Sequence, residues 1–157
     1  VTLEEAQRVL QNMSQLGPML VLEYLPGDEY SVDVFCSEGT AQVVVPRKRN
    51  RVSNGIVIDG ITEERCDLIA IIREMTPVLN LRHFYNIQFR LAQDGQPKVL
   101  DVNPRFCGSQ IISWAAGVNF PLLCIKEILG EPYEIPTPAW GIRMRRYWDS
   151  VFFNGAS

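Results

Sequence analysis

The sequence contains a single histidine, His83, among 157 residues. A metal centre built from several histidines is therefore excluded, and a Ser-His-Asp triad would have to use His83, which no motif supports. The four cysteines form no Cys-x-x-Cys pair. We therefore expect reduced and mostly buried thiols, as in a cytoplasmic protein.

Long apolar runs and an excess of basic charge are also lacking. No stretch of 18 apolar residues is present, so the sequence predicts no membrane span and no membrane partner. The formal net charge is −3, which gives no overall basic field to attract nucleic acid.

The composition, 46% apolar and 21% charged, is that of one globular domain over residues 1–157. Helical and alternating apolar patterns predict an α+β fold, a mainly antiparallel sheet with helices packed on one face. The predicted helices cover 2–17, 62–79, 109–117 and 121–130. Thr2 and Glu5 are expected to form a capping box at the first, and Thr62 and Ser109 to cap the second and third. The predicted strands cover 19–24, 30–36, 40–45, 85–91, 99–103 and 142–148, with a polar loop over 47–55 and a proline-rich linker over 132–138.

The most informative segment reads Asp101-Val102-Asn103-Pro104-Arg105. Side chains alternate along a strand, so Asp101 and Asn103 project to the same face. Two oxygen ligands in this arrangement suit Mg²⁺, which keeps phosphate and water as its other ligands. Arg105 can hold a carboxylate or phosphate through two parallel hydrogen bonds. Gln88 lies 13 residues before Asp101, in the predicted neighbouring strand.

This hairpin resembles the metal-binding hairpin of the ATP-grasp superfamily, in particular of carbamoyl-phosphate synthase large-chain-like proteins. The resemblance implies that Gln88, Asp101 and Asn103 hold Mg²⁺ or Mn²⁺ together with ATP, and that Arg105 is catalytic. Asp101 stands where the superfamily usually has the longer Glu, which leaves the number of ions open. A plain hairpin with a polar outer face is the alternative interpretation.

A second segment, residues 20–34, resembles the ATP-grasp hinge that lines the adenine. The resemblance implies that Glu23 and the backbone of Tyr24 and Leu25 meet the adenine edge. It also implies that Glu29 accepts hydrogen bonds from the ribose hydroxyls. The alternative is that Glu23 and Glu29 are solvated surface charges.

The segment from Arg47 to Arg51 carries four cations in five positions. A solvated loop and a nucleic-acid contact are both open, although no aromatic residues are interleaved for stacking on bases. The ATP-grasp resemblance implies instead that Arg47 and Arg51 face the phosphates as catalytic residues.

The resemblance is best over residues 1–130, and residues 131–157 are interpreted as a linker and a terminal strand. By this resemblance, the chain corresponds to the C-terminal part of an ATP-grasp unit. It implies a parent enzyme that joins a small carboxylate to an amine, thiol or similar nucleophile through an acyl phosphate. We expect this chain to lack the N-terminal lobe, to be inactive alone, and to form homo-oligomers through an exposed inner face. A non-catalytic ATP-binding or assembly module is the alternative.

Overall fold

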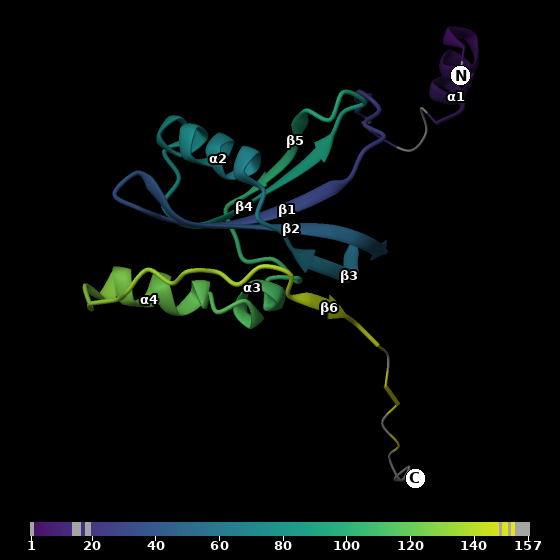
Figure 1. The fold of residues 1–157 in the computed structure, drawn as a ribbon. Helices are drawn as coiled ribbons and strands as arrows, with labels where there is room; N and C mark the ends of the chain where they lie inside the picture. The colour runs from purple at the N-terminus through teal and green to yellow at the C-terminus, as the bar shows by residue number, and fades with distance from the viewer. Residues whose placement is uncertain (1, 14–16, 18–19, 148, 151, 153–157) are drawn as a thin grey trace.

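The computed structural model describes residues 2–13, 17, 20–147, 149–150 and 152. Its central feature is a six-stranded sheet in the order β5-β4-β1-β2-β3-β6, in which all neighbours are antiparallel (Figure 1). The strands are β1 (Glu29–Ser37), β2 (Thr40–Ser53), β3 (Ile56–Thr62), β4 (His83–Leu91), β5 (Pro97–Asn103) and β6 (Arg143–Arg145). The helices are α1 (Leu3–Met13), α2 (Cys66–Leu79), α3 (Ile111–Ala115) and α4 (Phe120–Leu129).

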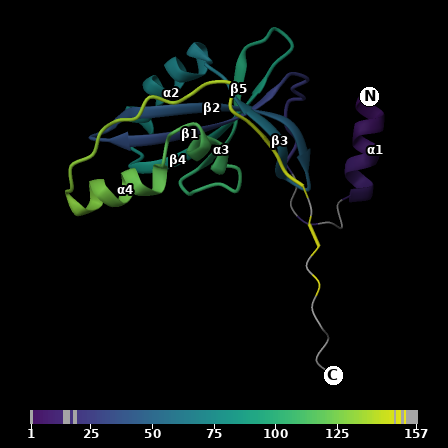
Figure 2. The ribbon, with the colours of Figure 1, turned by 60° about the horizontal axis from the view of Figure 1, so that its bottom comes forward.

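The predicted α+β class with a mainly antiparallel sheet is confirmed, and helices pack on both faces of the sheet where the sequence predicted one. The helix α2 covers one face, where Val34 of β1 and Ile72 share a core cluster. The helices α3 and α4 lie along the other face, where Phe35 packs in a second cluster with Phe120 (Figures 1 and 2). Because β1 carries apolar residues at successive positions, both of its faces bury hydrophobic surface.

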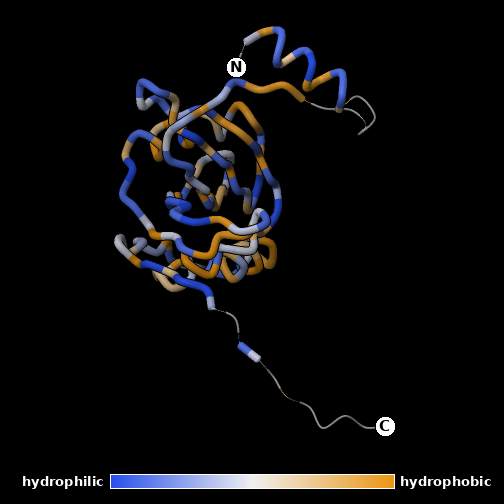
Figure 3. Tube along the Cα trace, turned by 90° about the vertical axis from the view of Figure 1, so that its right-hand side faces the viewer, coloured by the Kyte–Doolittle hydropathy of each residue, from blue (hydrophilic) through white to orange (hydrophobic). Residues whose placement is uncertain are grey.

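Two local predictions are confirmed closely. At the start of α1, the backbone N–H of Glu5 donates to Thr2 Oγ1 at 3.2 Å, and the N–H of Thr2 donates to Glu5 Oε2 at 2.8 Å, which forms the expected capping box. The hairpin of β4 and β5 turns at Gly95, as its sequence predicts. The helix α1 contains no buried residue and stands apart from the body of the molecule (Figure 3).

The strand predicted over 19–24 is wrong for residues 20–24, which the structure describes without regular secondary structure; residue 19 lies outside the described residues. Its apolar side chains Leu20 and Val21 are exposed. A strand forms only where a neighbour satisfies its backbone groups, and a run of apolar residues alone does not supply that neighbour.

The polar loop predicted over 47–55 is also wrong. The strand β2 continues to Ser53 and pairs with β3, which the sequence interpretation missed. Charged side chains of this stretch are accommodated because they form ion pairs with acidic residues, as Arg47 does with Asp33 and Arg49 with Glu29. Thr62, predicted to cap a helix, ends β3 and donates its hydroxyl to the Ala139 carbonyl at 3.0 Å.

Two further boundaries differ from the prediction. The helix predicted from Ser109 begins at Ile111, and the Ser109 hydroxyl accepts a hydrogen bond from Arg47 instead of capping the helix. The terminal strand predicted over 142–148 is observed over Arg143–Arg145, and residue 148 lies outside the described residues. Among the helices described here, none has both the length and the apolar character required to cross a bilayer.

Candidate functional site

The predicted metal ligands are brought together by the register of the strands. Gln88 of β4 stands directly opposite Asp101 of β5 and, on its other side, opposite Ser31 of β1. Ser31 in turn stands opposite Arg47 of β2. Directly opposed residues project to the same face, so a polar row crosses the sheet on the face that α3 covers.

The predicted metal ligands on β5 are in direct contact. Asn103 Nδ2 donates to Asp101 Oδ2 at 2.6 Å, so the two side chains lie on one side of the strand, with Gln88 opposite. Turning the Asn103 amide would place its oxygen beside the carboxylate, an arrangement that a cation between them stabilises. One carboxylate and two amide oxygens suit Mg²⁺, because phosphate and water complete its shell.

The described residues contain no group of three or more His, Cys, Asp or Glu side chains able to hold a metal. The predicted set contains a single such residue, Asp101, with Gln88 and Asn103 as neutral ligands. A cation held by these three side chains would therefore need further ligands, such as water or a nucleotide phosphate.

Beside Gln88 lies a polar pocket of about 150 Å³. Its walls include Ser31, Arg49, Gln88, Arg105, Cys107 and Gly108. Arg105 is exposed and donates to the Phe106 carbonyl at 3.2 Å, which leaves most of its guanidinium donors toward solvent and the pocket. Two guanidinium groups thus line one small cavity next to the predicted metal ligands, a combination suited to a carboxylate or phosphate.

Arg47 lies below this pocket in a fully buried network. Its guanidinium donates to Asp33 Oδ1 at 2.7 Å and to the Ser109 hydroxyl and carbonyl at 2.6 and 3.0 Å. Burial opposes the charged form, but the Asp33 carboxylate and Cys107 raise the pKa of Arg47 above its usual value. Its side chain is 1% exposed. Because Arg47 donates to Ser109, it joins β2 to the segment that also carries Arg105.

Asp33 is the common acceptor of that network. Besides Arg47, it accepts from Asn86 Nδ2 on Oδ1 and from the Ser113 hydroxyl on Oδ2, both at 2.7 Å. Cys107 donates its thiol to Asp33 at 3.5 Å, and burial with this neighbouring carboxylate raises the pKa of the Cys107 thiol. These contacts connect β1, β2, β4 and α3, which explains why the charges remain buried.

Two of the other three cations of the basic run, residues 47–51, are paired with carboxylates. Lys48 pairs with Asp28 at 2.7 Å, and Arg49 pairs with Glu29. Arg51 is exposed on the part of β2 that pairs with β3. The run is therefore not the free basic loop that the nucleic-acid interpretation required.

Arg49 is a residue that the sequence interpretation did not select. Its side chain is nine-tenths buried, its Nε has no hydrogen-bond partner in the structure, and it lines the polar pocket. The sequence could have indicated this position of Arg49, because alternation along one strand places Arg47 and Arg49 on the same face. It was not recognised because the segment was interpreted as a loop.

The predicted hinge residues lie between α1 and β1. Leu25 is buried, whereas the Tyr24 side chain is 82% exposed. Glu23 pairs with Lys98 of β5 at 3.3 Å, and Glu29, at the start of β1, holds Arg49. Glu23 and Glu29 are therefore both engaged with cations rather than isolated.

Residues 15–149 match the family described as ATP-grasp in the biosynthetic pathway with Ter operon. Because this match covers most of the chain, the chain belongs to this ATP-grasp family. The predicted recognition is thereby confirmed at the level of the superfamily.

Relatives of known activity are similar over much of the chain. Carnosine synthase 1 of Gallus gallus is 27% identical over 131 residues, which are 76% of this chain and 14% of that protein. The L-amino acid ligase of Bacillus licheniformis has the same fold, with a TM-score of 0.57 and 17% identity over 82% of this chain and 35% of that structure. An ADP complex of N5-carboxyaminoimidazole ribonucleotide synthetase gives a TM-score of 0.64 and 18% identity, over 83% of this chain and 37% of that one.

The chain spans about one-seventh of the length of the carnosine synthase and about one-third of each solved structure. It therefore corresponds to one part of the fold of these proteins.

Proposed function

We propose that this chain is the nucleotide- and metal-binding part of a ligase that activates a small carboxylate with ATP. The observation that carries the proposal is the juxtaposition of Gln88, Asp101 and Asn103 with the polar pocket that contains Arg49 and Arg105. Family membership supports the nucleotide, and the ligases among the relatives support the class of reaction.

In the proposed reaction, a carboxylate oxygen attacks the γ-phosphorus of ATP, and the bond from that phosphorus to the β–γ bridging oxygen breaks. The products are an acyl phosphate and ADP. An amine or similar nucleophile then attacks the acyl carbon, inorganic phosphate leaves with the bonding electron pair, and the nucleophile loses a proton. Gln88, Asp101 and Asn103 would hold Mg²⁺ or Mn²⁺, which would supply neutralisation of the phosphate charge.

The arginines have separate roles in this proposal. Arg105 neutralises the transferring phosphoryl group, and Arg49 with Arg105 holds the acceptor carboxylate in the polar pocket. Arg47, which the sequence assigned to the phosphates, acts instead as a positioning residue because it is buried against Asp33. Arg51 remains a prediction as a phosphate contact.

The hinge provides the nucleoside contacts in the proposal. Glu23 and the backbone of Tyr24 and Leu25 meet the adenine edge, and Glu29 accepts from the ribose hydroxyls. Glu29 would then be shared between the ribose and Arg49, which couples nucleotide binding to the polar pocket.

Calorimetric titration of the chain with a non-hydrolysable ATP analogue, with and without Mg²⁺, tests the proposal. We expect Mg²⁺-dependent binding that is lost in an Asp101→Ala/Asn103→Ala variant and retained in Asp94→Ala, which changes the turn of the same hairpin. Binding that is independent of Mg²⁺, or unchanged in the double variant, would overturn the metal assignment.

A non-catalytic ATP-binding or assembly module is the second candidate, favoured by the single carboxylate among the three metal ligands. It predicts nucleotide binding without ADP formation when carboxylates are supplied to the full-length protein. Carboxylate-dependent ADP formation would exclude it. The ligase proposal covers the full-length protein, and we propose that the chain alone does not turn over.

A further inference from the structure

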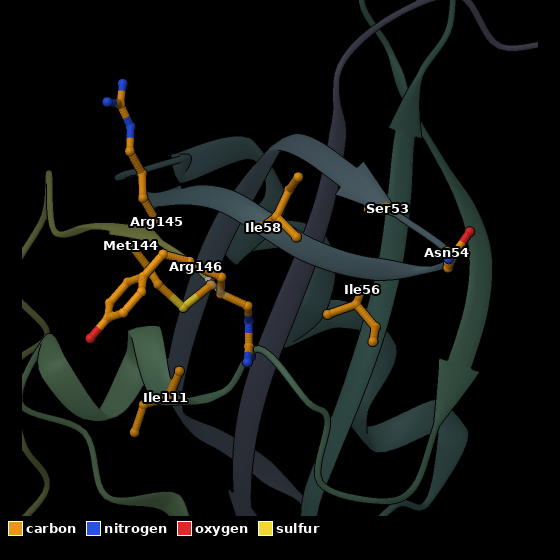
Figure 4. A pocket seen from close by; sticks show the side chains of 9 residues that line it. Ser53, Asn54, Ile56, Ile58, Ile111, Met144, Arg145 and Arg146 are labelled. Carbon is orange, nitrogen blue, oxygen red and sulfur yellow. The ribbon is translucent and has the colours of Figure 1, made fainter. Parts of the chain in front are cut away.

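A second, apolar pocket of about 490 Å³ opens on the α3 side of the sheet (Figure 4). It is lined mainly by Ile56 and Ile58 of β3, Ile111 of α3, and Met144, Arg146 and Tyr147 in and after β6. Its volume lies within the range of about 300 to 1,000 Å³ that is typical of small-molecule sites. Nothing in the proposed phosphoryl transfer uses it.

The apolar pocket adjoins the polar pocket. Ile56 lines both. Arg146 lines the apolar pocket, and its guanidinium donates to the carbonyls of Val57 at 3.0 Å and Gly108 at 2.5 Å, both of which line the polar pocket. One molecule could therefore occupy both cavities, with Ile56 and Arg146 at the junction.

The two pockets differ sharply in chemistry. The polar pocket is lined by the guanidinium groups of Arg105, which is exposed, and Arg49, which also pairs with Glu29. In the apolar pocket, the donors of Arg146 are engaged with backbone carbonyls, and Arg145 pairs with Asp59 at 3.0 Å. The isoleucine side chains that line the apolar pocket offer no hydrogen-bond donor, so a second carboxylate placed among them would lose its hydration without gaining a partner.

We propose that the apolar pocket holds the hydrophobic side group of the substrate whose carboxylate is activated in the polar pocket. This inference rests on the proposed function and specifies its substrate class: a monocarboxylate with an aliphatic or aromatic substituent, not a dicarboxylate. The half-exposed side chains of Ile56 and Ile111 would lose their contact with water when this substituent binds.

Ligand-observed NMR titration of the chain with acetate, butyrate, hexanoate and adipate tests the inference. Each methylene that enters the pocket is expected to tighten binding about fourfold, until the pocket is filled. Adipate, a dicarboxylate of the same chain length as hexanoate, is expected to bind much more weakly than hexanoate.

Two variants test whether the preference for hexanoate over acetate arises in the apolar pocket. Ile111→Asn should remove the preference for hexanoate and leave the binding of acetate unchanged, because Ile111 lines only the apolar pocket of the two. Ile128→Asn is the matched control, since Ile128 of α4 is 65% exposed, compared with 52% for Ile111, and lies outside both pockets. Both variants change an exposed isoleucine, so their folding should be equally little affected.

Equal affinities for acetate and hexanoate, no binding of any of the four acids, or equal losses in the two variants would overturn the inference. The proposed function is tested by Mg²⁺-dependent binding of the ATP analogue. The titrations with the four acids contain neither Mg²⁺ nor nucleotide, so the two failures can be distinguished.

Discussion

Arg47 Nη2 and Asp33 Oδ1 lie 2.7 Å apart, and both side chains are almost completely excluded from solvent. Such a pair gains little net free energy when formed, because both charges lose their hydration. Replacing only one of the two charged residues is costly, since the other charge is then buried without a partner. The pair therefore fixes the arrangement of β1, β2 and the turn before α3.

Arg47→Met is expected to lower the free energy of unfolding by about 3 to 5 kcal/mol, because Asp33 would keep a buried charge. The double variant Arg47→Met/Asp33→Leu should lose less than the sum of the single changes. Urea denaturation measures both, with the exposed Arg51→Met as the control, for which we expect a change of about 0.5 kcal/mol or less. Additive losses would show that the two charges are not coupled.

Gln88→Glu is expected to tighten Mg²⁺ binding in the presence of the ATP analogue on the order of tenfold, because a second carboxylate replaces a neutral ligand. Without metal, the new charge would stand opposite Asp101 and lower the melting temperature. Calorimetry and thermal unfolding with and without Mg²⁺ measure the two effects. The control is Gln93→Glu in the exposed turn, where neither effect is expected.

Gly27→Ala tests the connection between the hinge and β4. A Cβ at Gly27 would lie 2.6 Å from the Leu91 carbonyl oxygen and 2.7 Å from the Leu91 Cβ, and the Gly27 N–H donates to that carbonyl. We expect a loss of about 2 kcal/mol or more in unfolding free energy, together with weaker binding of the nucleotide analogue. Gly39→Ala, where φ is +74° and no atom lies within 4 Å, should cost only about 1 kcal/mol and leave nucleotide affinity unchanged.

Asp59 holds β6 to β3 through Arg143 and Arg145 at 2.7 and 3.0 Å. Hydrogen bonds from Arg143 and Asn50 lower the pKa of Asp59 below its usual 3.8. Because the folded-state pKa is the lower one, this stabilisation is complete well above pH 3.8 and is lost as pH falls below that value toward the folded-state pKa. The melting temperature of Asp59→Asn should therefore lie below that of the wild-type chain at pH 6, with a smaller difference at pH 3; an equal difference at both values would contradict the assignment.

The sequence predicted the hairpin of β4 and β5 well, because its evidence is local. Alternation places Asp101 and Asn103 on one face, and Gly95 marks the turn between the strands. The resemblance carried by this hairpin also identified the superfamily. The residues that matter most for the proposed metal site could therefore be named before any coordinates were known.

The basic run could not be interpreted correctly from its composition. Arg47, Lys48 and Arg49 are adjacent in sequence, yet each has a different acidic partner, and the exposed fractions of their side chains are 1%, 28% and 9%. Those partners are contributed by β1 and the turn before it, and the register of the strands decides which residues meet.

The sequence by itself determined the hairpin of β4 and β5, the helix α4 between Asn119 and Gly130, and the polar residues at the end of β5, because these depend on neighbours a few positions apart. Only the tertiary structure decided that Arg47 is buried and that Arg49 lines the polar pocket beside Arg105. Burial and pocket geometry depend on contacts between residues some 60 positions apart, as between Arg47 and Ser109, and local sequence does not specify which distant residue supplies the partner.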